Sequence, residues 1–181
     1  MNLRQAQTHS LRRHSLAFSL ALLGGVLGVA GAFFQELRGG GGPLIAFVGA
    51  PIIEEALKPS GVYVLLVRWP QVLSSRLYTA GLAALSGLCF GAIESATYVT
   101  LYVPEHTERF VLYRFTAPLF IHTLASFIVG FGINQRLLAS VRGEIPLLSG
   151  NRRFFVTGIV LHASFNITVT VLSLVGILNV K

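Results

Sequence analysis

The chain has 181 residues, of which 53% are hydrophobic and only 12% are charged, with a mean hydropathy of +0.70. A soluble domain carries about 25% charged residues, so this composition excludes an ordinary soluble fold. The net charge of +7 does not indicate a nucleic-acid partner, because the basic residues lie in short segments between apolar runs, where the orientation signals of membrane proteins occur.

Five apolar runs are long enough to cross a bilayer, which takes about 20 residues per helix. We expect these spans at about 15–34, 44–67, 78–102, 115–135 and 154–178. In the first run, Ala30-Gly31-Ala32 resembles a signal cleavage site, but the run exceeds the usual apolar region of about 7–15 residues and favours a retained helix. The sequence therefore predicts an all-α, polytopic membrane helix bundle, with one membrane-embedded domain over 1–181.

Basic residues in the connecting segments predict the orientation, because Lys and Arg are more frequent in cytoplasmic loops. With five spans and a glycine-rich turn over Gly39–Gly42, nine basic residues fall on the side of the N-terminus and four on the other. The larger group is Arg4, Arg12, Arg13, Arg68, Arg76, Arg136, Arg142, Arg152 and Arg153, and the smaller is Arg38, Arg109, Arg114 and Lys181. We expect a cytoplasmic N-terminus and an external C-terminus.

Ionisable residues also occur inside the predicted spans, where lipid disfavours them. They are Glu54, Glu55 and Lys58 in the second span, Glu94 in the third, His122 in the fourth and His162 in the fifth. A charged side chain at the bilayer centre costs about 2.5–3.5 kcal/mol on insertion scales, so these groups should face the bundle interior or a wet cavity. Together they are a candidate functional site.

In the second span, the spacing of the charges and prolines predicts a pocket. Glu54 and Lys58 are four residues apart, so they share a helix face and can pair. Pro51 and Pro59 bracket them, and each removes a backbone donor. Irregular helix at membrane depth is tolerated where it lines a cavity, so we expect a water-accessible pocket beside Glu54 and Glu55.

Two further spans carry polar groups on one face. Gly87, Gly91 and Glu94 share a face of the third span, where the glycines allow a neighbouring helix to approach the carboxylate. His162 and Asn166 are four residues apart and project together from the fifth span. The spacing therefore favours one site shared by several helices.

The ordered motifs resemble those of the PrsW family of intramembrane proteases, which is related to the wider Rce1/CAAX-type group. The family pattern reads EExxK, FxxxE followed by Asn, HxxxxxxxG and HxxxN on successive helices. The matching segments are Glu54 to Lys58, Phe90 to Glu94, His122 to Gly130 and His162 to Asn166. The resemblance covers roughly residues 50–166, and one departure is Ser95 at the position of the Asn.

The resemblance implies an intramembrane peptidase that hydrolyses a peptide bond of a membrane protein or lipid-embedded peptide. In bacteria, such proteases are associated with the cleavage of membrane-anchored anti-sigma factors. We therefore expect an integral membrane protein of a bacterial-type plasma membrane, with the bilayer as its environment.

The implied mechanism begins with a glutamate-activated water. Glu54 or Glu55 would be the general base toward that water, and the residues leave open which one acts. Lys58 would support them by pairing with a glutamate and holding the charge balance of the site.

The remaining motif residues receive positioning and stabilising roles. His122 and Glu94 would position the water, and His162 and Asn166 could donate to the oxyanion of the tetrahedral intermediate. We expect chemistry without a cofactor. The alternative is a zinc site, in which Glu54, Glu94, His122 and His162 are the ligands, although an HExxH motif is absent.

Other classes of membrane protein remain as alternatives. A proton-coupled transporter also uses Glu, His and Lys within the membrane, although many transporters contain a repeat and this chain shows none. A haem protein could use His122 and His162 as axial ligands. A non-catalytic scaffold would keep its function after both Glu54→Gln and Glu55→Gln.

Overall fold

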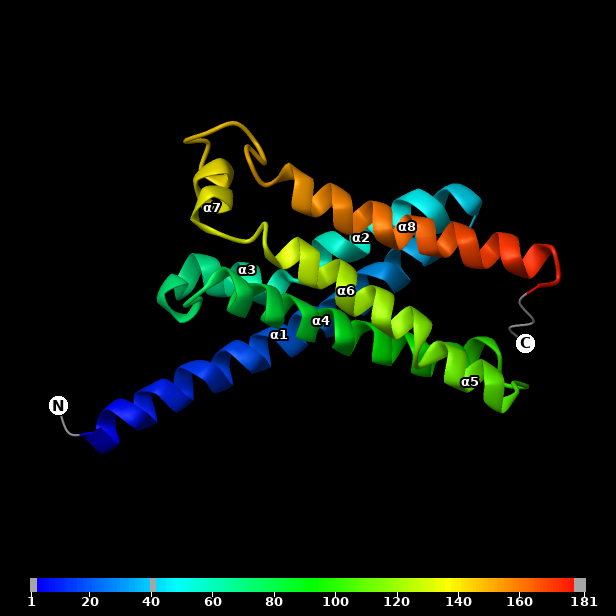
Figure 1. The fold of residues 1–181 in the computed structure, drawn as a ribbon, viewed down its shortest axis with the longest axis horizontal. Helices are drawn as coiled ribbons and strands as arrows, with labels where there is room; N and C mark the ends of the chain where they lie inside the picture. The colour runs from blue at the N-terminus through cyan, green and yellow to red at the C-terminus, as the bar shows by residue number, and fades with distance from the viewer. Residues whose placement is uncertain (1–2, 40–41, 178–181) are drawn as a thin grey trace.

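The computed structural model describes residues 3–39 and 42–177, and this part of the chain forms helices and no strands. The helices in chain order are α1 (Leu3–Gly39), α2 (Ala50–Leu57), α3 (Ser60–Arg68), α4 (Arg76–Thr97), α5 (Glu108–Arg114), α6 (Ala117–Gly130), α7 (Gln135–Val141) and α8 (Arg152–Leu174) (Figure 1). A π-helical turn, Ile45–Gly49, precedes α2, and a second, Tyr98–Tyr102, follows α4. The predicted all-α fold is confirmed.

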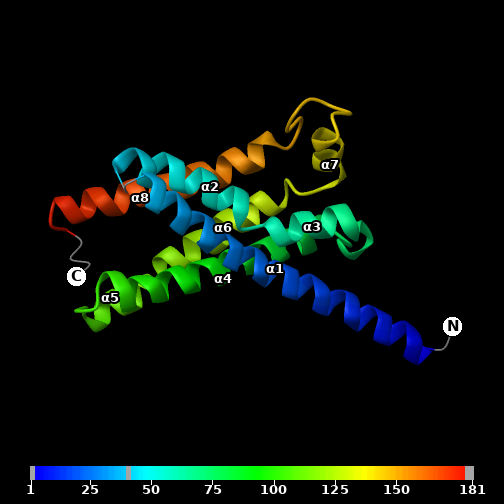
Figure 2. The same ribbon diagram turned by 180° about the vertical axis from the view of Figure 1, so that it is seen from behind.

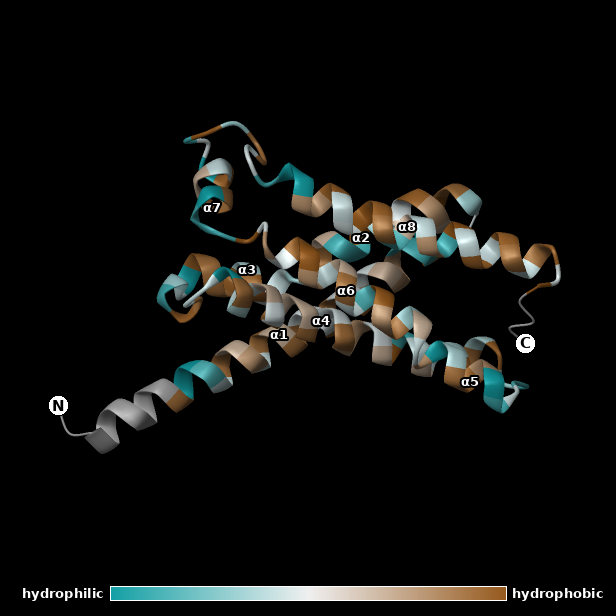
Figure 3. Ribbon diagram, viewed as in Figure 1, coloured by the Kyte–Doolittle hydropathy of each residue, from teal (hydrophilic) through white to brown (hydrophobic). Residues whose placement is uncertain are grey.

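Four helical segments are long and apolar enough to cross a membrane within the described residues. They are Leu11–Arg38, Arg76–Tyr102, Glu108–Gly130 and Arg152–Leu174, and they correspond to the first, third, fourth and fifth predicted spans. Hydrophobic residues dominate along these helices, and hydrophilic residues gather toward their ends and at α7 (Figure 3). The centre of the predicted turn at Gly40 and Gly41, the end of the fifth span at 178 and Lys181 lie outside the described residues.

The second predicted span is not one continuous helix, so four long helices replace the five expected. Residues 45–68 form the first π-helical turn, α2 and α3 in series. Pro51 lies in the first turn of α2 and begins that helix, where a missing N–H costs nothing. Pro59 separates α2 from α3, because it cannot donate a hydrogen bond back to α2.

Hydrogen bonds to α3 and to α4 stabilise the chain at the break beside Pro59. The Pro59 carbonyl accepts from the backbone N–H groups of Val62 and Tyr63, at 2.8 and 3.0 Å, and so starts α3. The carbonyl of Lys58 accepts instead from the hydroxyl of Ser86 on α4. This hydrogen bond links the end of α2 to α4, close to the predicted charges.

The long helices pack around the broken segment. Helix α4 lies along α6, α6 contacts α8, and α1 crosses the bundle on the face seen in Figure 2. Buried apolar residues cluster toward the end of the molecule that holds α3 and α7. This core comprises Ala17, Ala21, Val62, Leu65, Leu66, Val72, Leu82, Ala83, Ile133, Leu137 and Leu138.

Two segments predicted as connections contain short helices. Helix α5 precedes α6, and the Thr107 hydroxyl caps its start by accepting from Phe110 N at 3.2 Å. Helix α7 lies between α6 and α8, and the Asn134 side chain caps it by accepting from Arg136 N and Leu137 N. Side-chain caps satisfy the donors at a helix start, so these turns are local structures that hydropathy alone does not reveal.

Candidate functional site

The ionisable residues of the predicted spans come together at one place in the bundle. Lys58, at the end of α2, is completely buried, and its Nζ lies 2.7 Å from Glu55 Oε1 and 3.2 Å from Glu54 Oε2. The ammonium also lies over the ring of Phe90 on α4, 4.1 Å from its centroid. The predicted pairing of Glu54 with Lys58 is confirmed, and Lys58 contacts both glutamates.

His122, on α6, is held by two partners of opposite charge. Its Nε2 lies 2.9 Å from Glu94 Oε2, and its Nδ1 lies 2.9 Å from Lys58 Nζ. An ammonium can only donate, so Nδ1 is the accepting nitrogen and Nε2 carries the proton that is donated to Glu94. Glu94 therefore fixes the tautomer of His122 and leaves Nδ1 as the nitrogen with a lone pair.

His162, on α8, has the opposite arrangement. Its Nδ1 lies 3.0 Å from Glu55 Oε1, and the ring is almost completely buried. The second oxygen of Glu55 accepts from the Ser126 hydroxyl of α6, at 3.2 Å. The carboxylate thus orients His162 from behind and leaves Nε2 as the nitrogen with a lone pair.

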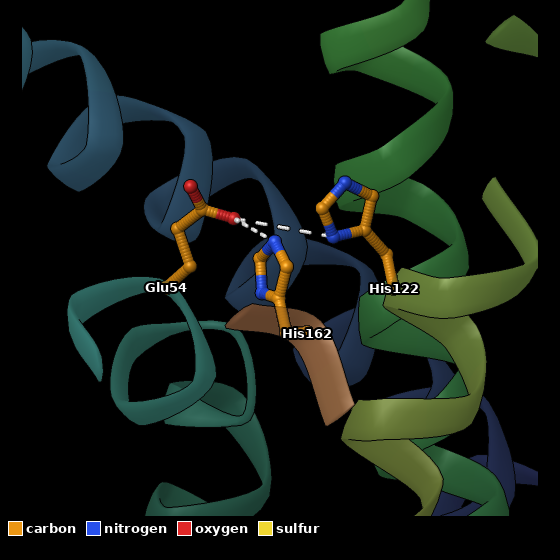
Figure 4. Close-up of side chains that lie close together, drawn as sticks. All are labelled: Glu54, His122 and His162. Carbon is orange, nitrogen blue, oxygen red and sulfur yellow. Dashed lines mark ion pairs between the residues drawn. The ribbon is translucent and has the colours of Figure 1, made fainter. Parts of the chain in front are cut away.

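The two lone-pair nitrogens converge on Glu54. Its Oε2 lies 3.9 Å from His122 Nδ1 and 3.8 Å from His162 Nε2, and Figure 4 shows the three side chains pointing toward one another. One ligand atom from each residue lies within 4.8 Å of the others. Glu54 Oε2 is buried and accepts no hydrogen bond from the described residues, although Lys58 Nζ is close. Two imidazoles and one carboxylate, each histidine backed by a second carboxylate, fit a zinc-type site.

Glu94 does not join this group, although it is one of the four ligands in the zinc alternative. It lies behind His122 and contacts the ring nitrogen that faces away from Glu54. Arg114 NH2 also contacts Glu94 Oε2, at 2.8 Å. In this arrangement Glu94 orients a histidine, which is the usual work of a carboxylate outside the ligand set.

The two adjacent glutamates of α2 have different environments. Glu54 lines a cavity of about 540 Å³, whereas Glu55 is completely buried and does not line it. Each oxygen of Glu55 already has a partner, from Lys58 and His162 on one side and Ser126 on the other. The geometry therefore favours Glu54 as the glutamate that can meet a substrate or a water.

The glycines of α4 allow the close contact that the sequence predicts. A Cβ at Gly87 would meet the His122 carbonyl and Ser126, and one at Gly91 would lie 3.1 Å from the His122 ring. Helix α6 can therefore lie directly against α4, which brings His122 within hydrogen-bonding distance of Glu94.

The cavity beside Glu54 is lined by α1, α2, both π-helical turns, α4, α5, α6 and α8. Its polar lining comprises Gln35, Glu36, Glu54, Glu94, Thr97, Tyr98, Tyr102, Tyr113, Arg114, His122, Asn166 and Thr170. A cavity of this size falls within the range of about 300–1,000 Å³ that is typical of ligand sites. The predicted pocket beside Glu54 is present, and Glu55 lies outside it.

Asn166 lines the cavity but already has one partner. Its Nδ2 donates to the carbonyl of Ala46 in the first π-helical turn, at 3.2 Å. The wide turn leaves that carbonyl available, and π-helical turns occur frequently at functional sites. Asn166 therefore joins α8 to the segment that begins α2, and one amide hydrogen remains for another acceptor.

Two contributors to the site were not predicted from the sequence. Arg114 was counted only among the loop charges, yet it is buried, contacts Glu94 and stacks on Tyr98 at 3.9 Å. Ser95, at the position where the family has Asn, donates to the Arg114 carbonyl at 2.7 Å. The available signal was that Arg114 directly precedes the fourth predicted span, which contains His122.

Comparison with known protein families matches residues 13–180 to the family described as PrsW family intramembrane metalloprotease. No similar protein was found among curated proteins, and no similar chain among solved structures. The match covers nearly the whole chain and includes all the residues that converge beside the cavity. The motif resemblance to the PrsW family is therefore confirmed, and the chain belongs to this family, which is described as one of intramembrane metalloproteases.

Proposed function

We propose that this chain hydrolyses a peptide bond of a membrane-anchored protein in the cavity beside Glu54. In this proposal Glu54, His122 and His162 hold a divalent metal of the zinc class. The observation that carries it is the convergence of two oriented imidazole nitrogens on the buried oxygen of Glu54. The family description favours a metal over the absence of any cofactor, which was the first expectation from the sequence.

When bound, such a metal would polarise the scissile carbonyl and make a water molecule more acidic. The protein orients the two histidines for this purpose. Glu94 holds the Nε2 proton of His122, and Glu55 holds the Nδ1 proton of His162. These second contacts keep each lone pair directed toward Glu54, which reduces the reorganisation needed for binding.

A carboxylate must accept the proton that the attacking water loses. Among the motif glutamates, only Glu54 and Glu94 line the cavity. Glu94 Oε2 is engaged by His122 and Arg114, so its other oxygen is the one available to a water. If Glu54 is only a ligand, Glu94 is the base, and Glu94→Gln should then lose turnover even when zinc is supplied in excess of its weakened affinity.

For the tetrahedral intermediate, we propose Asn166 as an oxyanion donor. One of its amide hydrogens is used by the Ala46 carbonyl, and the second can donate to the developing charge. The first contact fixes the amide at the cavity wall, so the donor is already positioned before the reaction.

A metal-independent mechanism is the second candidate, and one observation supports it. Lys58 Nζ lies 2.9 Å from His122 Nδ1 and 3.2 Å from Glu54 Oε2, so a positive charge is already present where a metal would compete for the same atoms. In that mechanism Glu54 is the general base for a water, and Lys58 balances its charge.

Cleavage of a single-span substrate by purified protein tests the proposed function. We expect Glu54→Gln, His122→Ala and His162→Ala each to lower turnover by at least about 100-fold, because each removes a ligand or the base. Glu144→Gln is the matched control, since Glu144 is exposed and far along the chain from the motifs. Unchanged cleavage in all three variants would contradict the proposal.

The family places the chain among intramembrane proteases, which disfavours the transporter, haem-protein and scaffold alternatives. A substrate embedded in the membrane follows from that assignment. The anti-sigma-factor substrate and the bacterial plasma membrane stay predictions, and we retain them as the first substrate class and location to test.

A further inference from the structure

Three buried polar atoms without a hydrogen-bond partner among the described residues lie around the cavity beside Glu54. They are Gln35 Oε1, Glu54 Oε2 and Arg114 Nε, and each residue lines the cavity. Buried polar groups in native proteins are nearly always hydrogen-bonded. Three such atoms without a partner, all in residues that line one cavity, therefore need an explanation. Glu54 belongs to the proposed metal site. The other two have no role in the mechanism above.

The side-chain amide of Gln35 packs against a glycine at the cavity wall. It lies near the end of α1, and a Cβ placed on Gly49 would lie 2.5 Å from Gln35 Nε2. The amide therefore occupies the space that a side chain at Gly49 would fill. Its nitrogen lies against Gly49 of the π-helical turn, and its oxygen is buried without a hydrogen-bond partner among the described residues.

Arg114 is held on the α5 side of the same cavity. It is 9% exposed, its NH2 contacts Glu94 Oε2, and its guanidinium stacks on Tyr98. These contacts fix the plane of the guanidinium and leave Nε–H as a donor without a partner among the described residues. Because Glu94 already balances the positive charge, the remaining Nε donor suits a neutral acceptor better than an acidic side chain.

A peptide substrate supplies both missing partners. Before hydrolysis, a substrate helix must unwind locally, and unwound backbone in a membrane needs protein groups in place of water for its N–H and C=O groups. We propose that Gln35 and Arg114 bind the backbone of the unwound substrate segment. Both atoms are buried in the free chain, so the cavity must widen beside them as the substrate enters. Gln35 Oε1 then accepts a substrate N–H, and Arg114 Nε donates to a substrate C=O. The inference rests on the proposed function, because it assumes that the scissile bond lies beside Glu54.

The apolar lining fits the side chains of such a segment. Among its residues are Val29, Phe33, Phe47, Phe165 and Val169, which line the cavity from α1, the first π-helical turn and α8. A main chain contacted by neutral donors and acceptors, with apolar side chains around it, is a site for an extended apolar peptide. Substrate selection would then depend on the ease of unwinding more than on one charged side chain.

Binding of a fluorescent single-span peptide to the full chain in nanodiscs tests this inference, with cleavage measured in parallel. We expect Gln35→Leu to weaken the peptide Kd about tenfold and to leave kcat within about twofold, because the lost contact is made in the bound ground state as well. Gln135→Leu, at an exposed position of α7, is the matched control and should bind as wild type does. An unchanged Kd in Gln35→Leu would overturn the assignment of Gln35.

Arg114→Lys tests the other wall, because lysine can keep the charge beside Glu94 but has no Nε donor. We expect an approximately tenfold weaker Kd, with Arg109→Lys on the exposed face of α5 as the control. An unchanged Kd in Arg114→Lys would overturn the assignment of Arg114.

A backbone-ester scan distinguishes substrate contact from a merely structural role. Replacing one substrate amide at a time with an ester removes one N–H, and we expect a single position to weaken wild-type binding but not the binding of Gln35→Leu. Identical scans for the two proteins would overturn the inference. Failure of the proposed function can be distinguished from failure of this inference. In that case wild type and Glu54→Gln would cleave the substrate equally, whatever their Kd values.

Discussion

Each histidine of the site has one nitrogen bound to a carboxylate outside the shared centre, and that nitrogen differs between them. His122 uses Nε2 toward Glu94, whereas His162 uses Nδ1 toward Glu55. The rings therefore approach Glu54 by opposite edges, and their centroids lie only 4.7 Å apart. The two histidines are therefore oriented by Glu94 and Glu55, neither of which is the carboxylate on which the rings converge.

Removing the charge behind His122 should weaken metal binding. We expect Glu94→Gln to lower the affinity for zinc by about 10–100-fold, as is usual for a carboxylate that holds a metal-binding histidine. Competition with a fluorescent chelator measures it. Glu144→Gln changes an exposed glutamate and should leave the affinity at the wild-type value. Equal affinities for wild type and Glu94→Gln would show that Glu94 does not orient a ligand.

Truncation of Asn166 should act on the transition state. We expect Asn166→Ala to lower kcat by about 100–1,000-fold, the usual cost of a lost oxyanion donor, with a smaller change in KM. Steady-state kinetics on a single-span substrate measures both constants. Thr170→Val alters the next turn of the same cavity wall and serves as the control. A kcat within twofold of wild type for Asn166→Ala would exclude the oxyanion role.

The motif residues could be predicted from the sequence, because ionisable side chains in apolar spans have few explanations other than a shared site. The sequence did not separate Glu54 from Glu55, since adjacent residues on a helix differ by about 100° in direction and only packing shows which one faces a cavity. Gln35 and Arg114 could not be found this way. Both lie near the ends of apolar segments, where polar residues are ordinary.

At the scale of elements, the contact between α1 and α3 depends on a missing side chain. A Cβ at Gly61 would overlap the Leu20 carbonyl of α1, closer than any real contact allows. We expect Gly61→Ala to lower the free energy of unfolding by about 1–3 kcal/mol, because the backbones must separate. Thermal unfolding in detergent measures the change.

A second glycine provides the control for Gly61. A Cβ placed on Gly81 of α4 would have nothing within 4 Å, so Gly81→Ala removes only the flexibility of glycine within a helix. This substitution should leave stability unchanged or raise it by up to about 1 kcal/mol. Equal destabilisation by both substitutions would contradict the close packing of α1 on α3.

Four of the five predicted spans match long helices because each is a regular helix, and a hydropathy pattern detects an apolar run that is long enough to cross the lipid. The second is irregular, as its two prolines indicated: Pro59 interrupts the hydrogen bonds of the helix, and the carbonyl of Lys58 accepts from Ser86 instead. The π-helical turns were not predicted, since a change from one helical register to another leaves the apolar pattern almost unaltered.

At the scale of the whole molecule, the two ends of the bundle differ in composition. The N-terminal end of α1 and α7 lie at one end, and α5 and the C-terminal end of α8 lie at the other (Figure 1). The first end carries Arg12, Arg13, Arg136 and Arg142, part of the larger basic group. The spatial arrangement agrees with the division of charges used to predict orientation, whereas the cytoplasmic side stays a prediction.

Labelling of single cysteines tests that orientation. In a Cys89→Ala background, we expect an impermeant thiol reagent to label Glu105→Cys in intact cells and to label Glu144→Cys only after the membrane is opened. The positive-inside bias is the physical reason, because the segment with Arg136, Arg142, Arg152 and Arg153 should stay in the cytoplasm. Labelling of Glu144→Cys in intact cells, with Glu105→Cys protected, would reverse the assignment.

The central claim is that Glu54, His122 and His162 form a metal-dependent hydrolytic centre inside the bundle. Zinc content and cleavage of a single-span substrate, measured on the same purified samples before and after chelation, test it most directly. A metal-dependent centre predicts about one zinc per active chain, loss of cleavage with loss of zinc, recovery on its return, and little zinc in His162→Ala. Full cleavage by wild type after its metal has been removed would contradict the claim and favour a glutamate acting alone.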